Sequence, residues 1–306
     1  GVLVLMLAII PFANANTVHI MRAESPGPTP EKLVPKMGKA VKVLYLMYVA
    51  LTAILVVFLL FGKMPLFDAL IHAFGTAGTG GFSSKQASIG AYNSAYIDIV
   101  ITIFMALFGV NFSIYFLYLR GDWRTAIKEE ECRFYFGAII AATLLIAFNI
   151  FRTVYPSFFT ALRYASFQVS SIITTTGYAN TNFTLWPVFS QLILILLMFL
   201  GASAGSTGGG IKCVRALLLL KMSRREISRV VHPNSVQTIK LNGKTVKEAT
   251  LSAIALYFFI YIVLVAAAVA LVCLDGIDLT TSSSAVFSAM GNIGPGLGLA
   301  GPAGSF

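Results

Sequence analysis

Long apolar stretches alternate with short ones along the chain, and a glycine-rich turn follows each short stretch. Val41 to Phe61 is long enough to cross a membrane, because about 20 apolar residues span the hydrocarbon layer. The next apolar stretch, MPLFDALIHAF, is too short to cross, and the turn GTAGTGGFSS follows it. Tyr96 to Leu119 is again long enough. This pattern predicts two membrane spans joined by a short helix that enters the membrane and returns.

The same pattern recurs further along the chain. Phe134 to Phe151 is followed by the interrupted stretch PSFFTALRYASFQVSSI, the turn TTTGYANTNF and a span that begins at Val188. A third copy begins at Ala249, runs to Cys273 and continues with LTTSSSAVFSAM and GNIGPGLG. Internal repeats of this size define the fold more strongly than any single motif does. The sequence therefore predicts an all-α fold of repeated units: span, short re-entrant helix, glycine loop, span.

Composition and charge place this fold in a membrane. The chain is 57% hydrophobic and 11% charged, whereas soluble domains carry about 25% charged residues. Most basic residues gather in three segments, residues 22–42, 120–133 and 212–247, and each segment flanks apolar spans. The positive-inside rule explains these segments better than nucleic-acid binding does, and it places all three on the cytoplasmic side. Lipid is therefore an expected partner, and nucleic acid is not.

The three glycine loops share a signature that points to cation binding. A backbone that enters the membrane without crossing it must line a cavity or be buried in protein. The loops TGGF, TTGY and NIGP each follow a short helix, whose negative C-terminal end favours a cation. TTTGY is similar to the filter strand TVGYG of potassium channels, in which backbone carbonyls replace the hydration shell of the ion. Glycine permits the positive φ that such a strand needs.

Five stretches together carry a family resemblance: RAESPG, LFDALIHAFGTAGTGGFSS, TTTGY, GASAGSTGGGIK and GNIGPGLG. The sequence resembles the Trk/Ktr/HKT superfamily of potassium transporters, and most of all the bacterial Trk-type potassium-translocating subunit. The resemblance implies an all-α integral membrane fold with pseudo-fourfold repeats around one pore. It also implies that Phe82, Tyr178 and Pro295 brace the loops from outside. The potassium-binding filter residues would be Thr79, Gly80, Gly81, Thr175, Thr176, Gly177, Asn292, Ile293 and Gly294.

The resemblance also divides the chain into units. It implies that most of repeat one and the last helix of repeat four lie outside this sequence, with roughly 150 or more further residues expected at the N-terminus. The expected units are the end of the repeat-one inner helix (1–12), a cytoplasmic linker (13–42), pore repeat two (43–120), a linker (121–133), pore repeat three with a broken inner helix (134–223), a linker (224–248) and the truncated pore repeat four (249–306).

The glycine-rich run GASAGSTGGGIK interrupts an apolar span. It does not match a phosphate-binding loop, because Lys212 is followed by Cys213 rather than Ser or Thr. A packing face of small residues is an open alternative, although such faces recur every fourth residue and this run is contiguous. The resemblance implies a gating loop below the filter that obstructs the pore and moves to open it. Its residues would be Gly201, Ala204, Gly205, Ser206, Thr207, Gly208, Gly209, Gly210 and Lys212.

A few polar residues remain as weaker candidates. His72 lies four residues from Asp68, and support of the short helix is favoured over a metal or proton site. Asp68 and Arg163 are candidates for shaping the electric field at the outer mouth. The run Glu129 to Glu131 is interpreted as a solvated cytoplasmic turn. Apart from potassium as the transported ion, we expect no cofactor, and the sequence shows no catalytic constellation that would indicate an enzyme.

Together these features predict potassium uptake through a gated pore in the bacterial inner membrane, driven by the ion gradient and the membrane potential. Sodium-coupled potassium symport, or a pore that also passes sodium, is the alternative within transport. A non-conducting membrane sensor or scaffold is the alternative of another class. The resemblance further implies a homodimer and a cytosolic nucleotide-binding regulatory subunit that docks on the basic surface around Lys221 to Lys247.

Overall fold

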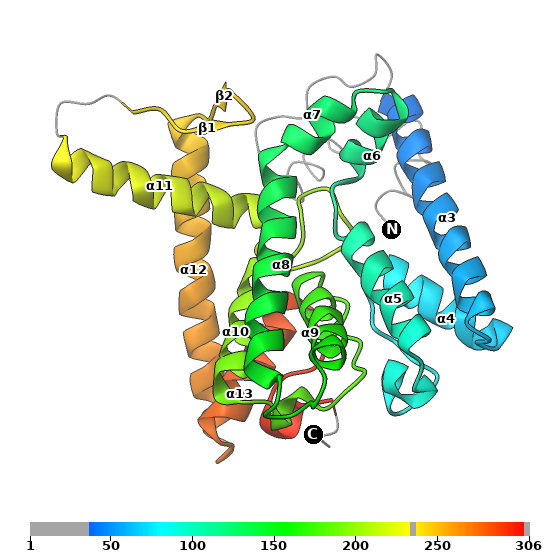
Figure 1. The fold of residues 1–306 in the computed structure, drawn as a ribbon. Helices are drawn as coiled ribbons and strands as arrows, with labels where there is room; N and C mark the ends of the chain where they lie inside the picture. Colours follow the sequence, from blue (N-terminus) through cyan, green and yellow to red (C-terminus); the bar gives the residue numbers. More distant parts are fainter. Residues whose placement is uncertain (1–36, 233–236, 303–306) are drawn as a thin grey trace.

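The computed structural model describes residues 37–232 and 237–302, with residues 37–42 described as backbone only. Almost every element in this part of the chain is a helix (Figure 1). The elements are α3 (Met37–Phe61), α4 (Leu66–Ala77), η1 (Ser88–Tyr92), α5 (Ala95–Phe108), α6 (Phe112–Leu119), α7 (Trp123–Lys128), α8 (Glu130–Ile150), α9 (Phe158–Ile173), η2 (Phe183–Leu185), α10 (Val188–Leu200), α11 (Cys213–Val231), β1 (Lys240–Leu241), β2 (Lys244–Thr245), α12 (Glu248–Cys273), α13 (Leu279–Gly291) and η3 (Gly298–Ala300).

The predicted repeat of long helix, short helix and loop is present three times. The short helices α4, α9 and α13 each pack on the long helix that precedes them, α3, α8 and α12. Within the described ranges, Val43–Phe61, Glu130–Ile150 and Glu248–Cys273 are long and apolar enough to cross a membrane. Helices α5 and α6 together would form a fourth span if the bent pair is counted as a single membrane-crossing segment. Large apolar side chains cover the outside of α12, where Phe259 is 66% exposed, as expected for a surface that faces lipid.

One predicted span is broken. The stretch from Tyr96 to Leu119 forms two helices, α5 and α6, which meet at an angle of 90°. Gly109 ends α5, and the Asn111 side chain starts α6 by accepting a hydrogen bond from the backbone N–H of Ser113 at 2.9 Å. Asparagine is a strong helix N-cap, so this short GVN segment both stops one helix and begins the next.

Several predicted linkers contain helix. α3 begins at Met37, α7 and the start of α8 lie within 121–133, and α11 continues to Val231. An antiparallel pair of two-residue strands, with Lys240 opposite Thr245, lies in the third linker. We call residues 239–246 the cytoplasmic hairpin, after the side on which the positive-inside rule places this basic segment. The predicted unit 1–12 and most of the linker 13–42 lie outside the described residues.

Helix α9 lies between α8 and α5 in Figure 1, and it packs on α8, α5 and α10. Its small residues Ala161 and Ala165 are fully buried and lie one helical turn apart. Such residues let neighbouring helices approach closely within a membrane. This packing places the loop after α9 between the loops that follow α4 and α13.

Candidate pore and gating loop

The loops that follow α4, α9 and α13 share one backbone conformation, and we call them the pore loops after the pore that the sequence predicts. In each loop the first and third residues have positive φ, which residues other than glycine rarely adopt. The φ values are 50°, 58° and 56° at Thr79, Thr175 and Asn292, and 65°, 84° and 111° at Gly81, Gly177 and Gly294. Positive φ at these two positions allows successive carbonyls to point toward the same side of a strand. The sequence indicated the glycines, but not the left-handed threonines and asparagine.

The same hydrogen bond sets the conformation of each loop. The backbone N–H of the second residue donates to the carbonyl five residues earlier in the short helix. These bonds are Gly80 to Gly75 at 2.7 Å, Thr176 to Ser171 at 2.9 Å and Ile293 to Ser288 at 2.8 Å. Three helices that differ at most positions therefore end in the same turn, which indicates a shared structural purpose.

The loops lie side by side in the order of the chain. A Cβ added to Gly81 would lie 2.0 Å from the carbonyl oxygen of Thr176, and one added to Gly177 would lie 1.9 Å from that of Ile293. Only glycine allows such close approach, and its positive φ adds a second reason. At Gly294 an added Cβ would meet no described atom within 4 Å. The carbonyls of neighbouring loops are thus brought to the same region of the protein.

Tyr178 connects two of the loops. Its buried hydroxyl lies 3.2 Å from each of the carbonyls of His72 and Phe82. The side chain of Phe82, which was predicted to brace its loop, is 78% exposed in the described structure. The bond to Tyr178 comes from the Phe82 carbonyl, while the Phe82 ring lies beside Gly80, where an added Cβ would be 3.1 Å from Cδ2. Pro295 lies near Gly177, since its Cδ would be 3.2 Å from a Cβ added there.

Replacing Tyr178 with phenylalanine tests this connection. We expect Tyr178→Phe to destabilise the folded protein by about 1 kcal/mol, because it removes hydrogen bonds between two loops without changing the shape of the core. The midpoint of thermal unfolding in detergent measures the effect. Tyr118→Phe is the control, because Tyr118 is 57% exposed. Equal midpoints for the two variants would contradict a bridging role for Tyr178.

The polar candidates near the pore loops contact one another. His72 Nδ1 donates to the Asp68 carbonyl at 2.7 Å, and Nε2 accepts from the Ser83 hydroxyl at 2.9 Å. The Ser84 hydroxyl donates to Asp68 at 2.6 Å, and Lys85 lies 3.8 Å from the same carboxylate. These bonds support the interpretation of His72 as a brace for its helix. No group of three or more His, Cys, Asp or Glu that could hold a metal ion occurs in residues 37–232 and 237–302.

Arg163 is paired with an acid from another helix. Its Nε lies 3.5 Å from the carboxylate of Asp98, which is in the first turn of α5. The ion pair joins α5 of one repeat to α9 of the next. The positive charge of Arg163 is therefore offset within the protein rather than presented alone at the mouth of the pore.

The glycine-rich run from Gly201 to Lys212 passes close to all three pore loops. Thr79 Oγ1 donates to the Thr207 carbonyl at 3.0 Å, and the N–H of Gly209 donates to Thr175 Oγ1 at 2.6 Å. A Cβ added to Gly209 would lie 2.9 Å from the carbonyl of Gly291, at the end of α13. The run therefore meets each loop at its first residues, where the short helix ends.

Close packing explains why this run lacks large side chains. A Cβ added to Gly208 would lie 2.5 Å from that of Ala202 and 2.8 Å from the carbonyl of Thr174. The Lys212 amino group donates to the Gly208 carbonyl and folds back over the run. We call residues 201–212 the intramembrane loop, because they connect the apolar helix α10 to α11 without helical structure.

The intramembrane loop is fixed to the break between α5 and α6. Ser203 N–H donates to the Gly109 carbonyl at 3.0 Å, and Phe112 N–H donates to the Gly205 carbonyl at 3.1 Å. Two unwound segments from different repeats thus satisfy each other's backbone groups, which a membrane interior requires.

Comparison with known proteins agrees with this geometry. A family profile described as TrkH, cation transport protein, matches residues 1–305. The chain belongs to the TrkH family. This confirms the predicted resemblance, the helical membrane architecture and the placement as a multi-pass protein of the bacterial inner membrane. A family of cation transport proteins also agrees with the prediction that the chain is not an enzyme.

Relatives within the TrkH family are similar along nearly the whole chain. The Trk system potassium uptake protein TrkH of Salmonella typhimurium is 36% identical over 302 residues, which are 98% of this chain and 62% of that protein. The TrkH protein of Escherichia coli K12 is also 36% identical, over 305 residues. The crystal structure of the potassium transporter TrkH from Vibrio parahaemolyticus has a TM-score of 0.83 at 31% identity. It is matched over 98% of this chain and 62% of that chain. The chain therefore spans 62% of the length of these relatives.

Glu131 is a functional candidate in this TrkH-family chain that sequence reasoning missed. The run Glu129 to Glu131 was predicted to be a solvated turn, but Glu131 is only 3% exposed. Its Oε1 accepts hydrogen bonds from the N–H groups of Ala204 at 2.6 Å and Val214 at 3.1 Å. The partners lie far away in the sequence, so a run of acids before an apolar span gave no sign of this contact.

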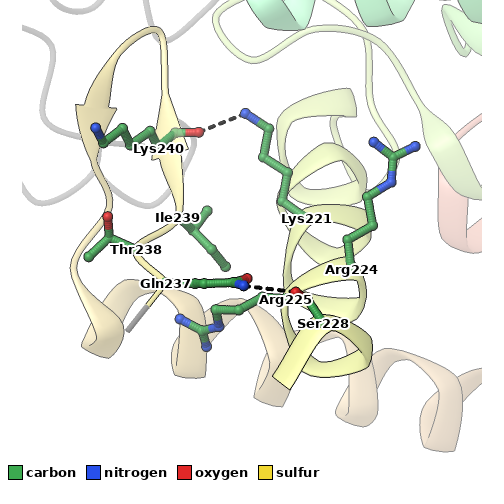
Figure 2. A pocket seen from close by; sticks show the side chains of 8 residues that line it. All are labelled: Lys221, Arg224, Arg225, Ser228, Gln237, Thr238, Ile239 and Lys240. Atoms are coloured by element: carbon green, nitrogen blue, oxygen red, sulfur yellow. Dashed lines mark hydrogen bonds between the residues drawn. The ribbon is translucent and has the colours of Figure 1, made fainter. Parts of the chain in front are cut away.

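A basic pocket lies between α11 and the cytoplasmic hairpin of the TrkH-family fold (Figure 2). It is lined by Lys221, Arg224, Arg225, Ser228, Gln237, Thr238, Ile239 and Lys240. Lys221 donates to the Lys240 carbonyl at 2.6 Å, and Gln237 donates to Ser228 at 2.8 Å. Arg225 pairs with Glu248 at 2.5 Å, and this bond holds the pKa of the guanidinium above its usual value. These contacts tie the hairpin and the residue Gln237 before it to α11, and they tie α11 to α12.

Proposed function

We propose that this chain provides three of the loops of a potassium-selective pore, and that the whole protein takes up potassium across the bacterial inner membrane. The observation that carries the proposal is the shared backbone of the three loops, which lie side by side with glycines against neighbouring carbonyls. Carbonyl oxygens in such a ring replace the hydration shell of a potassium ion. Thr79 to Gly81, Thr175 to Gly177 and Asn292 to Gly294 are the proposed binding residues.

Electrostatics favours a cation at this place. Helices α4, α9 and α13 all end at the loops, so the negative ends of three helix dipoles point toward the same region. The names of the relatives, which are potassium uptake proteins, support potassium as the ion. On this basis we propose the units 43–120, 134–223 and 249–306 as pore repeats two, three and four.

The intramembrane loop is the proposed gate. It contacts the first residues of all three pore loops and lies on the side where the short helices end. An ion that leaves the filter toward the cytoplasm would meet residues 204–210. In this proposal the loop obstructs the pore at rest and moves aside during conduction.

Two partners belong to the same proposal. The resemblance to Trk-type subunits implies a homodimer and a cytosolic nucleotide-binding regulatory subunit. The lysine and arginine side chains around the cytoplasmic pocket support an acidic docking surface on the regulatory partner.

Growth at low potassium tests the transport function. The full protein, expressed in a bacterium that lacks its own potassium uptake systems, should restore growth at low external potassium. Potassium uptake by these cells, measured with and without sodium, separates a potassium pathway from sodium-coupled symport. Absence of growth despite confirmed membrane insertion would contradict the proposal and favour a non-conducting sensor or scaffold.

A further inference from the structure

We propose that Glu131 is a positioning residue that holds the intramembrane loop beneath the pore loops, and that the two preceding glutamates connect it to the cytoplasmic hairpin. The inference rests on the proposed function, because it assigns a control element to the same gate. It concerns a residue at the start of α8, which belongs to neither the filter nor the loop.

One carboxylate oxygen joins both sides of the intramembrane loop. Ala204 lies near its beginning, and Val214 is the second residue of α11, two residues beyond its end. The first N–H groups of a helix have no partner within the helix, so Glu131 supplies one for α11. It also places a carboxylate at the N-terminus of that helix, where the dipole favours negative charge. The Glu131 side chain therefore holds the two ends of the segment 204–214 next to each other.

Burial gives this contact its importance. Glu131 is 3% exposed, so little water is available to replace the carboxylate as a partner for the two N–H groups. Hydrogen bonds to a charged group are stronger than those between neutral groups. The segment between the two bonds includes Thr207, which meets Thr79, and Gly209, which meets Thr175. Loss of the carboxylate would free the part of the loop that contacts the pore.

The neighbouring glutamates bind the other side of the protein. Asn242 N–H donates to Glu130 at 2.9 Å, Glu130 N–H donates to Asn242 Oδ1 at 2.8 Å, and Asn242 Nδ2 donates to Glu129 at 3.1 Å. Lys221 of α11 also donates to Glu130. Asn242 lies at the turn of the cytoplasmic hairpin with φ of 50°. Three consecutive glutamates thus connect a cytoplasmic turn to a loop within the membrane.

This connection gives the gate a mechanical input. A movement of the hairpin shifts the first turn of α8 through Glu129 and Glu130, and the same turn carries Glu131. The hairpin and α11 also form the basic pocket (Figure 2), so a molecule bound there would act on the elements that hold the turn of α8.

Flux measurements on the full protein in potassium-loaded proteoliposomes test the positioning role. Glu131→Ala should raise the potassium flux about tenfold, because two hydrogen bonds that hold the loop are lost. The preference for potassium over sodium should not change, since the pore loops are untouched. Glu131→Gln should raise the flux less than Glu131→Ala does, because its carbonyl oxygen can still accept both bonds but carries no charge. Glu226→Ala is the control, as Glu226 is an exposed acid on α11.

A change from the loop side gives a second measurement if Glu131→Ala fails to fold. Ala204→Pro removes one of the two N–H donors without altering α8, and we expect it to raise the flux in the same direction. Asn242→Ala should give a smaller increase, because the hairpin acts on Glu131 only through its neighbours. Unchanged flux in Asn242→Ala would contradict the connection to the hairpin.

A combination of variants separates this inference from the proposed function. In a protein that lacks residues 204–208, Glu131→Ala should cause no further increase in flux, because the bond to Ala204 is already gone. If the deletion raises the flux but Glu131→Ala and Ala204→Pro leave it unchanged or lower it, the positioning role is wrong and the proposed gate stands. If neither wild type nor any variant conducts potassium, the proposed function itself fails.

Discussion

Gly177→Ser should remove most of the preference for potassium over sodium. A Cβ at this position would lie 1.9 Å from the carbonyl oxygen of Ile293, so that carbonyl or the loop itself must move. The φ of 84° at Gly177 adds a strain of roughly 1–2 kcal/mol for an L-residue. Selective coordination depends on the number and placement of carbonyls around the ion. We therefore expect the selectivity ratio to fall about tenfold or more. A tenfold fall corresponds to a loss of about 1.4 kcal/mol in the difference between the binding free energies of the two ions.

Ion flux under opposed potassium and sodium gradients measures this ratio. Gly121→Ser is a matched control: Gly121 also has positive φ, of 81°, but an added Cβ would meet nothing within 4 Å. The control carries the backbone strain without the contact in the pore and should keep normal selectivity. An unchanged ratio in Gly177→Ser, with normal membrane insertion, would reject Gly177 as a filter residue.

Deleting Ala204 to Gly208 should raise potassium flux strongly. The deletion removes Thr207, whose carbonyl accepts from Thr79, and Gly208, which packs on Thr174 and receives the Lys212 amino group. It also removes the Ala204 N–H that Glu131 holds. With its main contacts to the pore lost, a shortened loop obstructs the path less. We expect an increase of about tenfold or more, the factor expected when hydrogen bonds worth a few kcal/mol no longer favour the closed state.

Initial rates of potassium efflux from proteoliposomes measure this increase. Selectivity provides an internal control, because the bonds that shape the pore loops come from α4, α9 and α13 and remain in place. Increased flux without preference between ions would indicate damage to the pore instead of an opened gate. Unchanged or abolished flux in a folded protein would count against obstruction by the loop.

The sequence alone predicted the architecture because apolar length is a strong signal in membrane proteins. The alternation of long and short apolar stretches located α3 and α4, α8 and α9, and α12 and α13. Glycine at the third position of each pore loop was also readable, because it permits the positive φ there, and at Gly81 and Gly177 no larger residue fits against the neighbouring carbonyl. These features depend on local properties of the chain.

Other features depend on partners that lie far away in the sequence. The break after Phe108 involves a single Gly and an Asn within an apolar stretch, and its unpaired backbone groups are tolerated because the intramembrane loop binds them. Glu131 is a buried acceptor only because Ala204 and Val214 approach it. Thr79 and Thr175 adopt left-handed conformations that their residue type disfavours. Each of these arises from tertiary contacts that local patterns do not encode.

The bonds between the α5–α6 break and the intramembrane loop have a consequence for hydration. When the loop moves away, the Gly109 carbonyl and the Phe112 N–H lose their partners. Hydrocarbon cannot replace them, and only water can. In the proposed gating movement, water molecules must therefore enter the space between the α5–α6 break and the loop, so that opening is also a wetting transition. If residues 201–212 are the gate that we propose, the described conformation is the dry one, and the thermodynamic activity of water controls opening.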